Sequence, residues 1–348
     1  MPHRRVSKNV SRLTGKIPPP PIVPLQPGNL VAPESKPRIR PIHLNEIDQA
    51  LKLYFADSPD NSRLLQEKVE SFKRLARRQQ YDLSRQMVVH CDNKIVAACL
   101  FIPQPGRNAL IFTSSPSFTA QDRPEMLHWS AQALRRSCLW AFRQGSTLLQ
   151  ALIEPADNAR CRLCEKSGFR RLTDLIYMSR CPDPLPQPLH PLDQITWLDY
   201  QPAHHDLFKS VIALTYHESL DCPELENLRD MEDVIRSHKA AGHFDPHCWK
   251  LLFWKNEPAG ALLLTPLPTP HTMELTYMGL CPPARGRQLG RLLLTEALCW
   301  ARQYHMCCLT LAVDCRNHPA LRLYRDFDFT PLFRRTVFIY SSRWQQNP

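Results

Sequence analysis

The sequence predicts a fold that mixes helices and strands, α/β in the broad sense and α+β in the narrower one, arranged as two tandem domains. Three observations support this fold class: two long segments resemble each other, a proline-rich stretch separates them, and both halves alternate strand-like and helix-like runs in the same order. A chain of 348 residues has room for two domains, each able to bury a core. The composition, 43% hydrophobic and 22% charged, is that of a soluble globular protein.

The repeat is visible in two pairs of segments. DNKIVAACLFIPQP (92–105) parallels KNEPAGALLLTPLP (255–268), and LCEKSGF (163–169) parallels LYRDFDF (323–329). The spacing between copies is nearly the same in both pairs, which indicates duplication of a whole domain.

Proline density marks the domain boundaries. Residues 181–193 are too rich in proline for helix or sheet and are the predicted linker. We therefore expect one domain at 38–180 and a second at 194–342. Residues 1–37 are predicted to form a disordered basic arm, because a stretch so rich in proline and charge cannot bury enough apolar surface to fold.

The arm carries most of the net charge of +11, since the first 40 residues hold eight Lys or Arg and a single acid, Glu34. One interpretation is a weak contact with nucleic acid, ribosomes or acidic surfaces. The other is a solubilising tail, and the lack of interleaved aromatic residues removes support for stacking on single strands.

Periodicity places the elements of the second half. The expected elements are a strand at 194–200, helices at 203–216 and 223–239, strands at 249–254, 259–265 and 273–280, a long helix at 288–304, and a strand at 307–313. In the long helix, apolar residues recur at helical spacing from Leu289 to Ala301, which predicts that one face packs on the sheet.

RGRQLGR (285–291) lies between the strand at 273–280 and the long helix. Backbone N–H groups at a helix N-terminus and the helix dipole favour an anion there. Glycine lets the backbone approach a ligand closely, and Arg285, Arg287 and Arg291 add positive charge. The segment therefore predicts a binding site for a diphosphate.

The same segment resembles the pyrophosphate-binding motif of the Gcn5-related N-acetyltransferase (GNAT) family, Gln/Arg-x-x-Gly-x-Gly/Ala. Arg285 and Gly290 occupy its outer positions, whereas Gln288 stands where the family usually has glycine. A second segment, NHPALRLYRDFDF (317–329), resembles the family's Asn-x-x-Ala-x-x-Leu-Tyr-x-x-x-Gly-Phe signature. It has Asp328 in place of glycine, and aspartate tolerates a left-handed helix end better than most residues.

The resemblance implies a mixed, mostly antiparallel sheet flanked by helices in each domain, with acetyl-CoA as cosubstrate. It also implies the cosubstrate-binding residues, which are Met278, Gly279, Leu280, Arg285, Gly286, Arg287, Gln288, Leu289, Gly290, Arg291 and Asn317. The backbone of 278–280 would line the thioester arm, and Asn317 would contact the pantetheine.

Acetyl transfer to an amine requires loss of a proton from the ammonium and protonation of the leaving thiolate. Glu274 is the expected base, acting through water, and Tyr324 is the expected acid. The simpler interpretation of Glu274 is a solvent-facing carboxylate on a strand, and that of Tyr324 is a tyrosine packed in the core. Asp221 and Glu224 are candidates for holding a cationic acceptor, and the alternative is that they cap the helix expected at 223.

The first half is expected to be a degenerate copy. Its counterpart of the phosphate loop, 117–124, lacks glycine, and Cys164 stands where the second half has Tyr324. We expect this half to support the other or to shape its substrate groove. The alternative is a second cofactor site.

The 13 cysteines are expected to be free thiols in a cytoplasmic protein, because the chain starts without an apolar signal core. Neither Cys161-x-x-Cys164 nor the pair Cys307-Cys308 has a second ligand pair at zinc spacing, so no metal is expected. Two other functions stay open: a non-catalytic acyl-CoA-binding or scaffolding protein, and a nucleic-acid- or ribosome-associated protein that uses the arm. The sequence does not determine the acceptor or the oligomeric state.

Overall fold

The computed structural model describes residues 36–56, 62–116, 125–187, 193–269 and 271–345. The expected arm, the first-half counterpart of the phosphate loop and residues 188–192 of the expected linker therefore lie outside the described residues, except for 36 and 37.

The first half contains six strands and four helices of the described chain. They are β1 (Arg38–Pro41), α1 (Ile47–Phe55), α2 (Ser62–Arg78), β2 (Gln86–Cys91), β3 (Lys94–Gln104), β4 (Asn108–Thr113), α4 (Glu125–Arg143), β5 (Leu148–Ile153), α5 (Asn158–Lys166) and β6 (Arg170–Arg180).

The second half repeats this order. Its elements are β7 (Ile195–Asp199), α6 (His205–Tyr216), the 3-10 turn η3 (Pro223–Leu225), α7 (Met231–Lys239), β8 (Trp249–Trp254), β9 (Glu257–Pro266), β10 (Thr272–Leu280), α8 (Leu289–Gln303), β11 (Cys308–Asp314), α9 (His318–Asp326) and β12 (Thr330–Ser341). The expected helix at 223–239 is wrong in its first part, because Glu226 is already non-helical and the helix starts only at Met231, after the N-cap Asp230.

Matching backbone conformations support the duplication. The β2–β3 turn has positive φ at Asp92 and Asn93, and the β8–β9 turn has positive φ at Lys255 and Asn256. Both turns fall in the repeated segments, and a left-handed pair of this kind is typical of two-residue hairpins.

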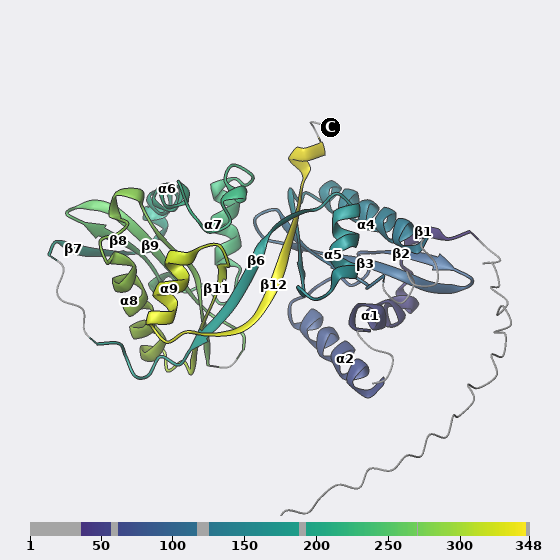
Figure 1. Cartoon of the computed structure of the whole chain (residues 1–348), viewed down its shortest axis with the longest axis horizontal. Helices are drawn as coiled ribbons and strands as arrows, with labels where there is room; N and C mark the ends of the chain where they lie inside the picture. The colour runs from purple at the N-terminus through teal and green to yellow at the C-terminus, as the bar shows by residue number, and fades with distance from the viewer. Residues whose placement is uncertain (1–35, 57–61, 117–124, 188–192, 270, 346–348) are drawn as a thin grey trace, which may run out of the picture.

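All described strands form one 12-stranded sheet, in the order β1-β2-β3-β4-β5-β12-β6-β11-β10-β9-β8-β7. The final strands of the two halves are exchanged: β12 pairs with β5 of the first half, and β6 pairs with β11 of the second. The two strands also pair with each other, side by side in the middle of the molecule (Figure 1). The sequence did not predict this exchange, because local pairing preferences do not identify a partner strand.

Helices cover both faces of the sheet, as expected. In the first half, α1 and α2 pack on one set of strand residues that includes Val88 and Leu100, and α4 packs on the alternate set that includes Val89 and Phe101. In the second half, α8 and α9 lie in front of the sheet in the view of Figure 1, and α6 and α7 lie behind it.

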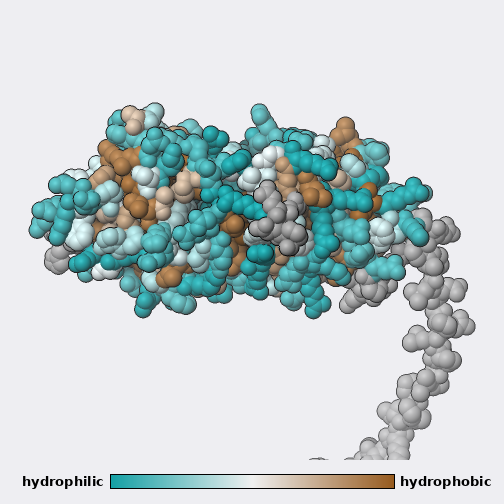
Figure 2. All heavy atoms as spheres, turned by 90° about the horizontal axis from the view of Figure 1, so that it is seen from above, coloured by the Kyte–Doolittle hydropathy of each residue, from teal (hydrophilic) through white to brown (hydrophobic). Residues whose placement is uncertain are grey.

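Contacts outside the sheet also join the halves. Arg107, in the β3–β4 turn, pairs with Asp233 of α7 at 2.6 Å, and Asn108 donates to the Ser237 hydroxyl at 2.8 Å. The surface shown in Figure 2 is mainly hydrophilic, with hydrophobic residues in separate patches. No helix among the described residues combines the length and hydropathy of a membrane span.

Strand exchange predicts that neither half folds alone. A fragment ending at residue 187 would leave β5 without β12, and a fragment starting at 193 would leave β11 without β6, so each exposes unpaired strand edges that promote aggregation. Expressed together, the fragments should form a one-to-one complex, measured by size-exclusion chromatography and circular dichroism. A chain cleaved between 187 and 193 should stay associated, and a monomeric, cooperatively unfolding half would contradict the exchange.

Candidate functional site

A cavity of about 660 Å³ opens in the second half, where β10 and β11 separate. The two strands pair in parallel only between Thr272–Glu274 and Cys308–Thr310. A register shift between Leu275 and Tyr277 then interrupts β10 against β9. Beyond this irregularity, residues 275–280 and 311–313 line the cavity instead of pairing with each other. A bulge that redirects a strand next to a site is a recurrent device in enzymes.

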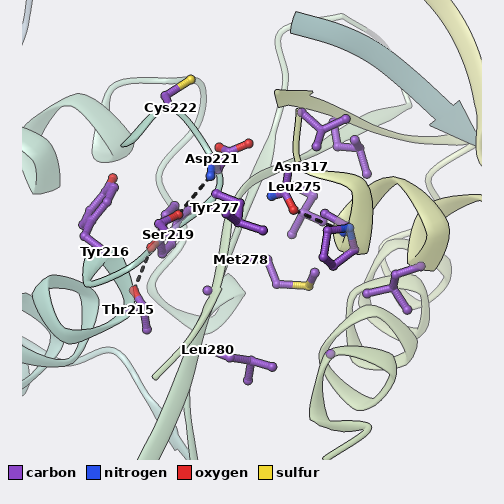
Figure 3. Close-up of a pocket in the computed structure, with 18 of the residues that line it drawn as sticks. Thr215, Tyr216, Ser219, Asp221, Cys222, Leu275, Tyr277, Met278, Leu280 and Asn317 are labelled. Atoms are coloured by element: carbon purple, nitrogen blue, oxygen red, sulfur yellow. Dashed lines mark hydrogen bonds between the residues drawn. The ribbon is translucent and has the colours of Figure 1, made fainter. Parts of the chain in front are cut away.

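Two sets of elements wall the cavity (Figure 3). One wall comes from the end of α6, the loop after it and α7, and includes Tyr216, Asp221 and Cys222. The other comes from the starts of α8 and α9, and includes Gly290 and Asn317. The separated strands connect the two walls, so one continuous space reaches both faces of the sheet.

The segment expected to bind phosphate contains two residues in the left-handed conformation, Gln288 and Gly286. Gln288 is the N-cap of α8 at φ 62°, ψ 3°, the left-handed conformation that favours glycine. Its side chain is exposed and makes no capping hydrogen bond. Gly286 is also left-handed, at φ 71°. At Gly290 a Cβ would lie 3.3 Å from Leu323, so glycine lets α8 approach α9 closely.

Arg285 has a different environment from the one expected. Its guanidinium donates to the carbonyl oxygens of Leu280, Thr215, His217 and Glu218 at 2.6–3.2 Å. These are the end of β10 and the C-terminal end of α6, where unpaired carbonyls attract a cation. The side chain therefore links the loop to α6, with few donors left for an anion.

The other two arginines lie nearer to solvent. Arg287 is exposed, with its guanidinium 5.6 Å from the centre of the Trp254 ring. Arg291 lies 3.6 Å from Asp326 in a loose, exposed ion pair. Among the expected cosubstrate residues, seven line the cavity (Met278, Gly279, Leu280, Arg285, Gly286, Gly290 and Asn317), whereas Arg287, Gln288, Leu289 and Arg291 do not. Leu289 is buried in the core.

Asn317 and Tyr324 both line the cavity. Asn317 caps α9 by accepting a hydrogen bond from the Ala320 N–H at 3.3 Å. Tyr324 is 7% exposed, and burial, followed by the nearby charge of Asp221, raises its pKa well above the ordinary value. Its helix ends with Asp328 at φ 59°, so the aspartate adopts the left-handed conformation predicted for it.

Asp221 faces the cavity and is held by a buried network. It accepts a hydrogen bond from the Asp314 N–H at 3.0 Å, and burial raises its pKa although it keeps accessible surface on the cavity. Asp314 is fully buried and accepts from Cys222 N–H at 3.1 Å and from the hydroxyl of Thr173 at 2.6 Å. Thr173 belongs to β6, so the first half contributes to the frame of this site.

Glu224 does not line the cavity. Both of its carboxylate oxygens accept from Arg316, at 2.6 and 2.9 Å, and this pairing lowers the pKa of Glu224. The ion pair ties the loop after α6 to the turn between β11 and α9. Glu224 also lies in the first turn of η3, so the alternative of a local structural role describes it better than contact with an acceptor.

Glu274 lies just outside the residues that line the cavity, one position before Leu275. It is half-buried, opposite Thr310 and Thr265 on the neighbouring strands. Burial raises the pKa of its carboxyl. Glu274 is thus less exposed than the solvent-facing carboxylate of the simpler interpretation. A raised pKa is compatible with a general base that works near neutral pH.

The cavity residues that were not anticipated from the sequence include Tyr216, Arg229, His238 and Tyr277. The Tyr277 hydroxyl lies 2.7 Å from that of Thr215, and its ring packs 5.4 Å from the rings of Tyr216 and His238. No motif contains these residues, and only the tertiary fold brings α6, α7 and β10 together.

The corresponding region of the first half is occupied by a side chain. There β4 and β5 pair only at Asn108–Leu110 and Leu148–Gln150, a similarly short parallel contact. Arg160, which corresponds to Ala320 in the repeat, donates to the Thr113 and Tyr54 carbonyls at 3.0 and 2.7 Å. Cys164 is buried, and burial raises its pKa to about 12. An inert thiol and a bridging arginine favour the interpretation as a degenerate copy.

Metal ligands do not gather in the described part of the chain, where no group of three or more His, Cys, Asp or Glu residues could hold an ion. All 13 cysteines are free.

Comparisons with known proteins agree with the fold. Residues 212–329 match the model of the acetyltransferase (GNAT) family. A GCN5-related N-acetyltransferase from Sphaerobacter thermophilus is 19% identical, with a TM-score of 0.58 over 88% of this chain and 95% of that chain. A GCN5-related glucosamine N-acetyltransferase region of a fungal multi-domain β-N-acetylglucosaminidase is 12% identical, with a TM-score of 0.53 over 89% of this chain and 38% of that chain.

A tandem GNAT protein from the clavulanic acid biosynthesis pathway is also similar, at 13% identity and a TM-score of 0.47 over 88% of this chain and 98% of that chain. Among curated proteins, none matches the sequence. The family match covers the half that contains the phosphate loop and the cavity, and the structure repeats its element order in the first half. Residues 212–329 therefore match the GNAT family, and the chain as a whole has a fold similar to that of GNAT acetyltransferases, with the element order repeated in its two halves.

Proposed function

We propose that the protein transfers an acetyl group from acetyl-CoA to the amine of a small molecule or protein. The observation that carries this proposal is the continuity of the cavity: it runs from the glycine-containing start of α8, past Tyr324 of α9 and between two separated strands, to the carboxylate of Asp221 on the opposite wall. This layout suits a long thioester that binds through its diphosphate at one end and reacts at the other.

The diphosphate would bind at the start of α8. The N–H groups of Leu289 and Gly290 precede the first hydrogen bonds of the helix, and left-handed Gly286 and Gln288 direct the loop backbone outward. Arg287 and Arg291 would supply charge from the rim. Arg285 positions the loop through the carbonyls of α6 and contributes little direct contact.

The thioester would lie along β10, beside residues 278–280. The side of β10 that faces away from β9 is not paired with β11 in this region, so backbone N–H groups there can stabilise the carbonyl oxygen as it becomes negative. Tyr324 would protonate the sulfur as it leaves. Its hydroxyl has no hydrogen-bond partner among the described residues, and its raised pKa keeps it protonated.

Asp221 would hold the ammonium form of the acceptor, and Glu274 would remove its proton through water. The neutral amine then attacks the carbonyl carbon, the new N–C bond forms, and the C–S bond breaks. The proton from the amine ends on Glu274, and the proton from Tyr324 ends on the thiol of CoA. Burial favours the assignment of Glu274 as the base, because it raises the pKa of that carboxyl. Asp221 must be ionised to hold the ammonium, and the hydrogen bond that it accepts from the Asp314 N–H favours this ionised form.

A calorimetric titration with acetyl-CoA should give one site per chain, in the second half. Changing Arg287 and Arg291 together to Ala should weaken binding about tenfold, because two charges near the diphosphate are lost. The matched control is Arg322→Ala, an exposed arginine of α9 outside the cavity, and its affinity should be unchanged. Two binding sites per chain would contradict the interpretation of the first half as a degenerate copy. If the folded protein did not bind acetyl-CoA, the proposed acetyl transfer would be wrong.

Glu274→Gln and Asp221→Asn should have different kinetic signatures. Because a base acts only when ionised, kcat of the native enzyme should fall as the pH drops through the raised pKa of Glu274. Glu274→Gln should lower kcat about 100-fold or more and remove this acidic limb. Asp221→Asn should instead raise KM for the amine about tenfold and keep the limb. If the two profiles are exchanged, the two roles are exchanged.

Tyr324→Phe should lower kcat by about 10- to 100-fold and leave the acetyl-CoA Kd within about twofold, because the hydroxyl acts only when the thiolate leaves. Tyr340→Phe, a tyrosine packed against Phe169 in the first half, is the control and should not change kcat. An unaltered kcat in Tyr324→Phe would show that this side chain only packs the cavity wall.

A further inference from the structure

The α6–α7 wall of the cavity contains a positively charged side chain that the mechanism above does not use. Arg229 lines the cavity and is half-buried. Its Nε atom is buried without a hydrogen-bond partner, and within the described ranges its guanidinium forms no ion pair with a carboxylate. A buried guanidinium nitrogen normally has a hydrogen-bond acceptor, so the surroundings of this Nε are incomplete.

His238 lies beside Arg229 and is incomplete in the same way. It also lines the cavity, and its Nε2 atom is buried with no partner. Burial, and then the neighbouring charge of Arg229, lower the pKa of His238 to about 3. The imidazole is therefore neutral at physiological pH, and it can donate a hydrogen bond to an anion without needing a proton from solvent.

Tyr216 connects this positive group to Asp221. Burial raises the pKa of its hydroxyl, and the charges of Arg229 and then of Asp221 also act on it, so the hydroxyl lies within electrostatic range of both groups. The rings of Tyr216 and Tyr277 pack 5.4 Å apart and form an apolar surface in the same wall. The wall thus presents an anion, an aromatic surface and an unpaired cation.

From this arrangement we propose that the acceptor is an amine that also carries a carboxylate, that is, an amino acid or a close analogue. Its ammonium group would lie at Asp221, and its carboxylate would accept hydrogen bonds from Arg229 and His238. This inference rests on the acetyl transfer proposed above and specifies its acceptor. A planar guanidinium suits a carboxylate because two parallel hydrogen bonds are possible.

The position of Arg229 separates it from the cosubstrate. The phosphate loop lies between β10 and α8, whereas Arg229 precedes α7 and its charge acts on Tyr216 and His238. The cosubstrate charges already have their own cations in Arg287 and Arg291. An acceptor without a negative group would leave Arg229 desolvated and unpaired in the complex, and this selects against such amines.

Matched pairs of amines that differ only in the carboxylate test the proposal: tyrosine and tyramine, histidine and histamine, arginine and agmatine, lysine and cadaverine. With the full chain and acetyl-CoA, at least one amino acid should have a kcat/KM about tenfold or more above that of its decarboxylated partner. Arg229→Gln should remove this preference by lowering turnover of the amino acid only. Arg236→Gln, an exposed arginine of α7 paired with Glu232, is the control and should keep it.

The same pairs should also be titrated calorimetrically into the protein saturated with CoA, which needs no turnover. Preferential, Arg229-dependent binding of an amino acid without acetylation would support the acceptor site and overturn the proposed acetyl transfer. A kcat/KM for the decarboxylated amines equal to or above that for the amino acids would overturn the inference. It would also be overturned if Arg229→Gln lowered kcat/KM equally for an amino acid and for its decarboxylated partner. The inference about the acceptor would also be overturned if no member of any pair bound or reacted. The titration with acetyl-CoA tests the cosubstrate site independently. The preference for amino acids over their decarboxylated partners is measured on the native protein. This part of the test therefore holds even if Arg229→Gln does not fold.

Discussion

The separation of β10 from β11 after Glu274 is the feature on which the rest of the site depends. Parallel strands that stay paired would fill the middle of the sheet with hydrogen bonds and leave no path through it. The irregularity near Thr276 ends the pairing and opens the cavity between the two faces. Every proposed role, from the start of α8 to Asp221, requires that opening.

The exchange of β6 and β12 makes the site in the second half depend on the first half. β6 supplies the strand that pairs with β11, and its Thr173 hydroxyl binds the fully buried Asp314. Burial by itself acts to raise the pKa of Asp314, but hydrogen bonds from Arg316 and Thr173 outweigh it and keep the carboxylate ionised. Asp314 in turn orients the loop that carries Asp221. The first half therefore stabilises the site of the second half, and this role does not require a similar cavity in the first half.

Charge is distributed unevenly within the site. The rim near α8 has arginines at or near the surface, where screening by solvent weakens them and a large anion can displace their present contacts. On the α6–α7 wall, Arg229 is half-buried and Asp221 faces the cavity. Electrostatic interactions are stronger where water is partly excluded than at an open surface. In the proposed reaction, the cosubstrate would bind through many weak contacts at the rim, and the acceptor would be selected by a few stronger contacts on the α6–α7 wall.

The sequence by itself determined the order of elements, the duplication, the turn at Gln288 and the left-handed end at Asp328, because local propensity and short motifs act over a few residues. It also predicted Asn317, Tyr324 and Asp221 near one another through a family resemblance. Only the tertiary structure decided the partners: strand exchange, Arg285 bound to carbonyls, Glu224 bound to Arg316, and Arg229 beside His238. These depend on contacts between residues far apart in the chain, and no local pattern specifies which buried group meets which.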